Sequence, residues 1–429
     1  MTTNELIELD PQILRELLKE KEISRQEFAQ QLGISTKTIQ RWVNGTVRRV
    51  RPDTLGRVAQ VLGVPPDRIR KSSIPLELRP INRVLEEICS DAFMARIRAM
   101  DDFPTYLKLL KTFNAQELCS AQRLTLYLQL GSTTFFLGRI RASRLYLDEA
   151  LKIAYSLNDT VKIIAILSWS ALREDFAGNS PEAMRMIEQA EQHLQYAKDS
   201  VTARADILFR KGHVLYHNER IEEAIPYIRD SILLEYKHPT LNLFRLGMKY
   251  YHLSECYIRQ RNFSKARATL KKTFHIAEKS GWVRGQSYSH FGLGIITIFE
   301  NGDCETVRGN FAKARVLRNH TTPERINTKA EQREFIYLAI KGQLREARDL
   351  VANHVRLNRR YIHFFAYSVL DALFFAKFSP ETFSLRGSLI ERATQYFEKN
   401  KLENALNAVK VLKSKERITK NELLELYVF

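Results

Sequence analysis

The sequence predicts an all-α protein in which a small N-terminal helical domain precedes a long array of helical hairpins. Glycine and proline are scarce, with 17 and 12 among 429 residues, or about 4% and 3% against averages of about 7% and 5%. Helix-capping signals outline several short helices near the N-terminus. A pattern of small and large side chains then recurs about every 41 residues through most of the remaining chain. These three features favour helices throughout, and 44% hydrophobic residues supply a core.

The first three helices are predicted from their capping residues. Asp10 can accept a hydrogen bond from a first-turn amide, and the proline that follows it presets helical φ. Ser24 and Glu27 form a capping box for a second helix. That helix ends at Gly33, because glycine tolerates positive φ. Ser35 can cap a third helix almost at once, so the second and third helices meet at a sharp angle.

The third helix presents a short cationic face rich in amide and hydroxyl groups. Ile39 and Trp42 point inward, and the helical spacing places five polar residues on the opposite face, namely Thr36, Lys37, Gln40, Arg41 and Asn44. Lysine and arginine donate to guanine, glutamine can pair with adenine, and threonine offers a hydroxyl and a methyl group. The stretch 41–51 contains four arginines and no acidic residue, which suits phosphate contacts.

The run ISRQEFAQQLGISTKTIQRWVNG, followed by RPDTLGRVAQVLGVPPDRI, adds a fourth helix over residues 53–63 and a short fifth helix opened at residues 65–67. Together these segments resemble the Xre/Cro/cI class of helix-turn-helix DNA-binding domains. The resemblance covers roughly residues 10–72 and implies a five-helix domain, residues 1–72, that binds a double-stranded DNA operator.

The resemblance also implies phosphate contacts from Arg25, Gln30 and Asn44, and base or adjacent backbone contacts from Ser35, Thr36, Lys37 and Arg41. With the basic stretch added, the predicted DNA-binding residues are Arg25, Gln30, Ser35, Thr36, Lys37, Gln40, Arg41, Asn44, Arg48, Arg49 and Arg51. The alternative is a helical bundle whose basic face is merely solvated or binds protein. Residues 73–80 contain proline and few helix signals, so we expect a linker there.

The repeat is read from six aligned positions. The expected inter-helix turns are Gly138, Gly178, Glu219, Arg261, Gly302 and Gly342. Five residues after each turn comes a mostly small residue: Ser143, Ala183, Ala224, Ala266, Val307 and Ala347. Four residues further on comes a large apolar residue: Leu147, Ile187, Ile228, Leu270, Phe311 and Val351. Three residues beyond that comes another mostly small residue: Ala150, Ala190, Ser231, Thr273, Ala314 and His354. Small side chains let the second helix of a hairpin lie close to its partners, and large ones fill the gap. His354 breaks the small-residue rule and indicates a frayed or terminal repeat.

This pattern resembles a degenerate tetratricopeptide array, with a period longer than the family's usual 34 residues. We expect the repeat domain to cover residues 81–360, with residues 80–113 helical and joined to it. Residues 361–429 should form further helices that cap the array or dimerise.

A helix-turn-helix domain joined to such an array resembles the RRNPP class of cytoplasmic peptide-sensing transcription regulators. The resemblance implies a homodimer whose concave repeat surface binds a short signalling peptide, as in quorum sensing. Inner positions of the first repeat helices give the predicted ligand-binding residues: Asp206, Phe209, Arg210, His213, Tyr216, Tyr251, Glu255, Arg259, Lys329 and Gln332. Aromatic and charged groups in such a row suit an extended peptide, although the same pattern is typical of ordinary core and solvated residues.

Enzymatic and metal-binding patterns are weak. His213 and His217 lie four residues apart, as do His252 and Cys256, but neither pair has a third ligand at a motif spacing. We expect ordinary helix-surface histidines, no metal, no cofactor and no enzymatic activity. The four cysteines are far apart and are interpreted as reduced core thiols. No apolar stretch approaches the ~18 residues of a membrane span, so we expect a cytoplasmic protein without membrane contact.

The formal charge of +18 is spread along the chain. Residues 1–79 carry 14 basic and 10 acidic residues, so the remaining chain holds +14 of the excess. The charge implies an anionic partner without locating it. Three hypotheses follow: a ligand-controlled transcription regulator, a constitutive DNA-binding scaffold that recruits a protein through its repeats, and a processing factor that binds nucleic acid in a basic groove of the repeats.

Overall fold

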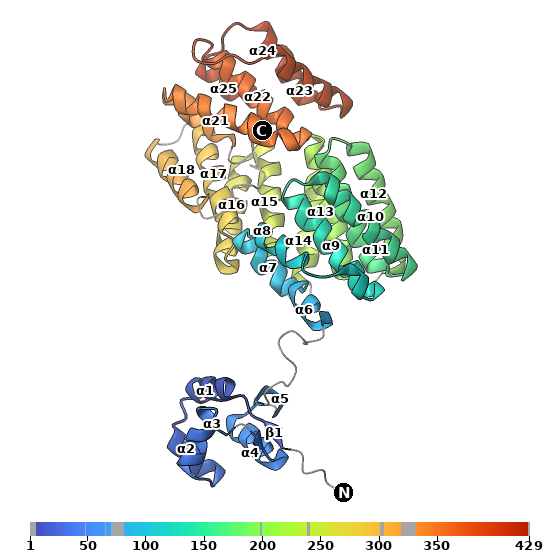
Figure 1. Cartoon of the computed structure of the whole chain (residues 1–429). Helices are drawn as coiled ribbons and strands as arrows, with labels where there is room; N and C mark the ends of the chain where they lie inside the picture. The colour runs from blue at the N-terminus through green and yellow to red at the C-terminus, as the bar shows by residue number, and fades with distance from the viewer. Residues whose placement is uncertain are drawn as a thin grey trace. The chain divides into compact units, whose positions relative to one another are not determined.

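The computed structural model describes residues 6–47, 49–64, 66–69, 81–197, 200–237, 241–300, 304–318 and 332–427. The chain divides into two compact units, Met1–Val84 and Leu85–Phe429, which are described separately. Helices dominate both units, which confirms the all-α class (Figure 1). The predicted linker at 73–80 lies outside the described residues.

The N-terminal unit contains the five expected short helices before residue 70: α1 (Pro11–Glu20), α2 (Arg25–Leu32), α3 (Thr36–Val43), α4 (Pro52–Leu62) and α5 (Pro66–Ile69). Leu14, Phe28, Ile39, Trp42 and Val58 lie in one buried cluster that joins α1 to α4. This core fixes the angle at which α3 stands on the bundle, and it leaves the polar side of α3 exposed.

The predicted capping signals are present in the structure. The Ser24 hydroxyl accepts a hydrogen bond from the Glu27 amide at 3.2 Å, and the Glu27 carboxylate accepts one from the Ser24 amide at 2.9 Å. Gly33 ends α2 with φ of 66°, a left-handed value that glycine adopts without steric cost. Ser35 then caps α3 by accepting from the Thr38 amide. The tight turn between α2 and α3 is therefore confirmed.

A short antiparallel pair joins β1 (Ile7–Glu8) to β2 (Arg49–Val50). The sequence does not predict this pair, because two residues are too few to show the alternation of a strand. Ile7 lies opposite Val50 and Glu8 opposite Arg49. The pair ties the segment before α1 to the basic stretch between α3 and α4.

The second unit is built from helical hairpins. Its helices are α6 (Ile81–Ile88), which begins just before the unit boundary, α7 (Asp91–Met100), α8 (Phe103–Leu110), α9 (Ser120–Phe136), α10 (Ile140–Ser156), α11 (Thr160–Phe176), α12 (Ser180–His193), α13 (Val201–His217), α14 (Ile221–Tyr236), α15 (Leu243–Arg259), α16 (Phe263–Ser280), α17 (Val283–Phe299), α18 (Cys304–Arg318), α20 (Glu334–Ile340), α21 (Leu344–Leu357), α22 (Ile362–Phe378), α23 (Gly387–Lys399), α24 (Glu403–Ser414) and α25 (Lys420–Leu426). Short 3-10 turns lie between some of these helices: η2 (Ala115–Glu117) before α9, η3 (Leu194–Tyr196) after α12 and η4 (Asn358–Arg360) between α21 and α22.

The predicted repeat register holds at the turns. Five aligned positions are described, and all five have positive φ: Gly138, Gly178, Glu219, Arg261 and Gly342. Gly302 lies outside the described residues. The small and large positions of the stripe on the second helix of each hairpin are buried in all six repeats. His354 is also buried, so the array is not frayed there and continues into α22.

The C-terminal helices pack against the turns of the array. Glu219 accepts hydrogen bonds from the Asn404 and Ala405 amides at the start of α24, and Arg261 donates to the Leu424 and Glu425 carbonyls at the end of α25. A carboxylate suits a helix N-terminus and a guanidinium suits a C-terminus. These contacts explain why two turns carry charged residues in a conformation that favours glycine.

The helices before the first repeat pack inside the array. Phe103 of α8 stacks on Phe136 of α9, with ring centroids 4.5 Å apart. Asp101, at the end of α7, accepts a hydrogen bond at 2.8 Å from Arg284 of α17, and both side chains are buried. This ion pair joins segments separated by 183 residues and anchors the end of α7 to the middle of the array.

Among the described cysteines, Cys89, Cys119 and Cys256 are free thiols. Cys119 is exposed, so its assignment as a core thiol was wrong; it precedes α9 and takes the N-cap position. Cys256 is buried as expected. Within the parts of the chain that the structure describes, no helix is both long and apolar enough to cross a membrane.

Candidate functional site

The first candidate site is the outer face of α3. The ten described residues of the predicted DNA-binding set are all exposed: Arg25, Gln30, Ser35, Thr36, Lys37, Gln40, Arg41, Asn44, Arg49 and Arg51. Arg48 lies outside the described residues. Ile39, Trp42 and Val43 hold the opposite side of α3 in the core. The helix therefore presents Lys37, Gln40 and Arg41 to solvent on a rigid support.

Two side chains near this face are already engaged. The Ser35 hydroxyl lies 2.9 Å from the Thr38 hydroxyl and also caps α3. Arg57 of α4 donates to the Leu32 carbonyl at the end of α2, which holds α4 against the turn. Arg49 stands opposite Glu8 in the strand pair.

The second candidate site is a cavity of about 560 Å³ in the repeat unit. Its walls come mainly from the first helices of consecutive hairpins, α9, α11, α13 and α15, with contributions from α7, α17 and α22. This volume is within the range of pockets that enclose a small ligand. The wall combines aromatic rings, basic groups and histidines.

The structure brings eight of the ten predicted ligand-binding residues to the wall of this cavity: Asp206, Phe209, Arg210, His213, Tyr216, Tyr251, Glu255 and Arg259. Gln332 is buried but does not line the cavity, so it is not brought together with the others. Lys329 lies outside the described residues. The inner positions of α13 and α15 thus meet at one cavity wall, and Gln332 lies apart from them.

The lining is strongly basic. Six basic residues face two acidic ones: Arg98, Lys162, Arg210, Arg245, Lys249 and Arg259 against Asp206 and Glu255. Both acids are paired, because Arg245 lies 2.6 Å from Asp206 and buried Arg333 lies 2.8 Å from Glu255. Lys249 is paired with Glu235 behind the wall. The acids that face the cavity are therefore neutralised, and basic charge is left over.

Arg210 contributes to this excess of basic charge. Its guanidinium lies over the rings of Trp169 and Phe209, at 5.2 and 5.9 Å from their centroids. Its Nε atom is buried and has no hydrogen-bond partner within the described parts of the chain. Burial lowers the pKa of Arg210 to about 10, although Asp206 and Asp175 act in the opposite direction. The side chain remains a cation at neutral pH and faces a cavity.

Four of the chain's ten histidines line the same cavity: His213, His217, His252 and His363. His213 and His217 are only 4% and 5% exposed, so their expected place on a helix surface was wrong. Burial, followed by the neighbouring histidines, lowers the pKa of His213 well below its ordinary value. Burial likewise lowers the pKa of His252 to about 3. Both imidazoles are therefore neutral at physiological pH.

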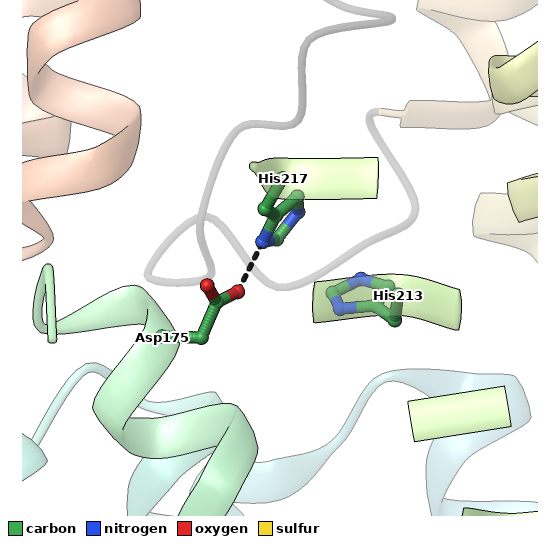
Figure 2. A group of neighbouring side chains, drawn as sticks. All are labelled: Asp175, His213 and His217. Carbon is green, nitrogen blue, oxygen red and sulfur yellow. Dashed lines mark hydrogen bonds and ion pairs between the residues drawn. The ribbon is translucent and has the colours of Figure 1, made fainter. Parts of the chain in front are cut away.

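Asp175 of α11 faces these histidines (Figure 2). Its carboxylate forms a short hydrogen bond with His217 Nδ1, and it also accepts from the Ser180 hydroxyl at 3.2 Å. One ligand atom from each of Asp175, His213 and His217 lies within 4.8 Å of the others. Helical spacing in the sequence is enough to pair His213 with His217. It does not reveal the carboxylate, because Asp175 precedes His217 by 42 residues.

Several lining residues escaped sequence reasoning. Arg98 comes from α7, which precedes the repeats, and His363 comes from α22, which follows them. Lys249 and Trp169 lie on repeat helices but outside the positions chosen as inner. A repeat alignment identifies only residues at equivalent positions of the repeats. It therefore cannot predict side chains that reach the cavity from helices outside the repeats.

Comparison with known proteins supports the architecture. Residues 14–69 match the helix-turn-helix family model, and residues 205–238 match a tetratricopeptide repeat model. A search of curated proteins finds no significant match. The chain thus joins a helix-turn-helix domain to a tetratricopeptide-like repeat domain, as the sequence predicts.

Among solved structures, a Rap protein complexed with the competence and sporulation factor is similar, with a TM-score of 0.52 and 11% identity, over 97% of this chain and 100% of that one. This likeness concerns the fold. The Bacillus thuringiensis regulator PlcR, solved with the peptide PapR7 and DNA, has a TM-score of 0.39 and 14% identity, over 66% of this chain and 98% of that one. Apo RapI has a TM-score of 0.44 and 13% identity, over 95% and 100% of the two chains.

Proposed function

We propose that this protein is a DNA-binding transcription regulator whose operator affinity is controlled by a short anionic peptide bound in the cavity of its repeat unit. The observation that carries the proposal is the coexistence of an exposed, rigidly supported polar face on α3 with an aromatic, net-basic cavity in the second unit.

The chemistry of α3 supports DNA recognition. Lys37 and Arg41 offer donors for guanine and Gln40 can pair with adenine, and all three are exposed on a helix whose other side is buried. The capped turn and the Arg57 contact fix α3 relative to α2 and α4. Recognition of a DNA sequence requires such a rigid support, because side-chain contacts distinguish one base from another only when the position of the helix is fixed.

The chemistry of the cavity supports an anionic ligand. Its acids are already neutralised by Arg245 and Arg333, whereas the buried Nε atom of Arg210 has no hydrogen-bond partner within the described residues. A carboxylate, at a peptide C-terminus or on an acidic side chain, would pair with Arg210, and the rings of Trp169 and Phe209 would pack against apolar side chains. A peptide combines these groups in one short chain.

The Rap protein of similar fold was solved in complex with the competence and sporulation factor, which agrees with a ligand bound by the repeat unit. A homodimer on a two-fold operator belongs to the same proposal, since paired half-sites double the contacts that each α3 makes.

Helix α7 is the proposed coupling element. It contributes Arg98 to the cavity wall, and its C-terminal end is anchored through the Asp101–Arg284 ion pair. It also follows directly from α6 and the segment that leads to the N-terminal unit. A ligand that moves Arg98 would therefore act on a helix that α6 alone separates in sequence from the segment leading to the DNA-binding domain.

The experiment has two arms on the full chain. Genomic fragments bound by the protein are selected and sequenced, which should yield a common motif that Lys37→Ala or Arg41→Ala blurs. Synthetic peptides encoded by neighbouring short reading frames are then titrated while tryptophan fluorescence is followed, and the part of the change that is lost in Trp169→Phe is assigned to the cavity wall. DNA selection without any peptide response would favour the constitutive scaffold. Retention of DNA affinity after substitution of the α3 face would favour a nucleic-acid groove in the repeats.

A further inference from the structure

The buried carboxylate of Asp175 lacks a cationic partner of the usual kind. It is fully buried, and within the described parts of the chain its hydrogen-bond partners are His217 and Ser180. The Arg210 guanidinium acts on it electrostatically, but no lysine or arginine among the described residues forms a direct ion pair with it. Buried charges in proteins are paired or bind metal ions, because desolvation of an isolated charge is very unfavourable. The carboxylate therefore calls for a cation beside it.

Imidazoles surround the carboxylate on the cavity side. His213 and His217 lie one helical turn apart on α13, with ring centroids 4.2 Å from each other. His252 stands 4.3 Å from the ring of His213, and His363 stacks 4.2 Å from that of His217. His213 Nδ1 is buried without a hydrogen-bond partner. In the tautomer that carries its proton on Nε2, this buried nitrogen has an electron pair available for a ligand.

We propose that Asp175, His213 and His217 bind a divalent transition-metal ion, with Zn²⁺ as the best-matched ion. Two imidazoles and one carboxylate form a common zinc ligand set that leaves a fourth position open. The ligand atoms lie within 4.8 Å of one another, close enough for one ion to draw them to metal–ligand distances of about 2.0–2.2 Å. His252 and His363 flank the set and complete an imidazole-rich wall.

The alternative occupant is a proton. If His217 is protonated, the resulting imidazolium neutralises Asp175 without any metal ion. The two interpretations predict different results when metal is added. If a proton neutralises Asp175, the site does not bind Zn²⁺ that is added at a stoichiometric concentration. Hard cations such as Mg²⁺ are disfavoured here, because they prefer all-oxygen ligand sets.

This site would also act on a cavity ligand. Two members of the set, His213 and His217, line the same cavity as Arg210, so a metal ion held by them would lie close to the space where a carboxylate would bind. The metal proposal stands independently of the proposed function, because it rests on the cluster alone. A metal-free protein could still bind peptide and DNA, and a metal-binding protein could do neither.

The test uses full-length protein stripped with chelator, without peptide or DNA. Zn²⁺ is titrated calorimetrically, and the metal retained after desalting is counted by mass spectrometry. Co²⁺ is then substituted, since its visible absorption reports nitrogen and oxygen ligation in a low-symmetry site. We expect one metal ion per chain and a Co²⁺ spectrum that added Zn²⁺ abolishes.

Three variants locate the site. His213→Gln and Asp175→Asn should each weaken Zn²⁺ binding at least about 100-fold, beyond the effect of losing only a supporting residue. His290→Gln is the matched control, because this half-buried histidine of α17 is hydrogen-bonded to Asn310 and lies outside the cavity; its affinity should equal that of the natural protein. Circular dichroism checks that each variant is folded. No retained metal, or equal affinity in folded His213→Gln and His290→Gln proteins, would overturn the proposal.

Discussion

Replacement of Arg210 by methionine should stabilise the ligand-free protein and weaken ligand binding at the same time. Arg210 faces the cavity as a cation, and its buried Nε has no partner among the described residues. Methionine keeps much of the packing of the aliphatic stem but carries no charge. The substitution therefore isolates the cost of holding an unpaired guanidinium in the wall.

The magnitude follows from the pKa of Arg210. Burial lowers it from 12.5 to about 10, and each pKa unit corresponds to about 1.4 kcal/mol. Keeping the charged form thus costs on the order of 3 kcal/mol at neutral pH, and this cost fades as the pH rises through about 10. Stacking on Trp169 and Phe209 returns about 1–2 kcal/mol. The net gain from Arg210→Met is therefore about 1–2 kcal/mol.

Urea unfolding of the full chain, followed by far-ultraviolet circular dichroism at pH 7, measures this difference. Arg245→Met is the matched comparison, because Arg245 pairs with Asp206 and Glu235 in the same wall. Its removal leaves a buried carboxylate less compensated and should cost about 1–3 kcal/mol. The two substitutions are thus expected to shift the urea concentration at the midpoint of unfolding in opposite directions. A loss of stability in Arg210→Met as large as that in Arg245→Met would refute the reasoning.

Three further predictions test other parts of the account. Arg41→Ala should relax base preference at one position of each half-site at a cost of about 1–3 kcal/mol, read by binding-site selection; a uniform loss across sequences would argue against base reading. Gly212→Ala should destabilise the array by about 1–3 kcal/mol, because its Cβ would lie 2.7 Å from a side-chain atom and 3.0 Å from a carbonyl oxygen of α14. Gly56→Ala, with nothing within 4 Å, should instead stabilise by about 0.5–1 kcal/mol, and thermal melts separate the two. The pKa of Glu422 is lowered from 4.5 to about 2 by its hydrogen bond with Lys415, so its contribution is present above about pH 4.5 and is lost as the pH falls toward 2; Glu422→Gln should remove that part of the acid dependence of unfolding.

The sequence was sufficient for the regular parts of the fold. Capping residues such as Ser24 and Ser35 bond to backbone amides only three residues away, so the local sequence is enough to predict where these helices begin. The repeat register was readable for a similar reason, since each hairpin meets the same packing requirement. Even Glu219 and Arg261, which lack the glycine of other turns, fell at positive φ as aligned.

The rest depends on contacts distant in the chain. Asp175 reaches His217 across 42 residues, and Asp101 reaches Arg284 across 183. No spacing rule connects such pairs, because a solenoid brings residues together by stacking successive hairpins. Burial of His213 was missed because a histidine on a polar-looking helix face resembles a solvated one until the opposing wall is known.

The most direct test of the central claim is the operator affinity of the full chain with and without a bound peptide. Fluorescence anisotropy of a selected operator fragment is measured at fixed salt, with synthetic peptides that carry a free carboxyl terminus. A peptide that binds the natural protein should change operator affinity by about 5-fold or more, and Arg210→Met should abolish that change while leaving affinity for DNA alone intact. A bound peptide that leaves operator affinity unchanged, or an equal response in Arg210→Met, would contradict control through the cavity.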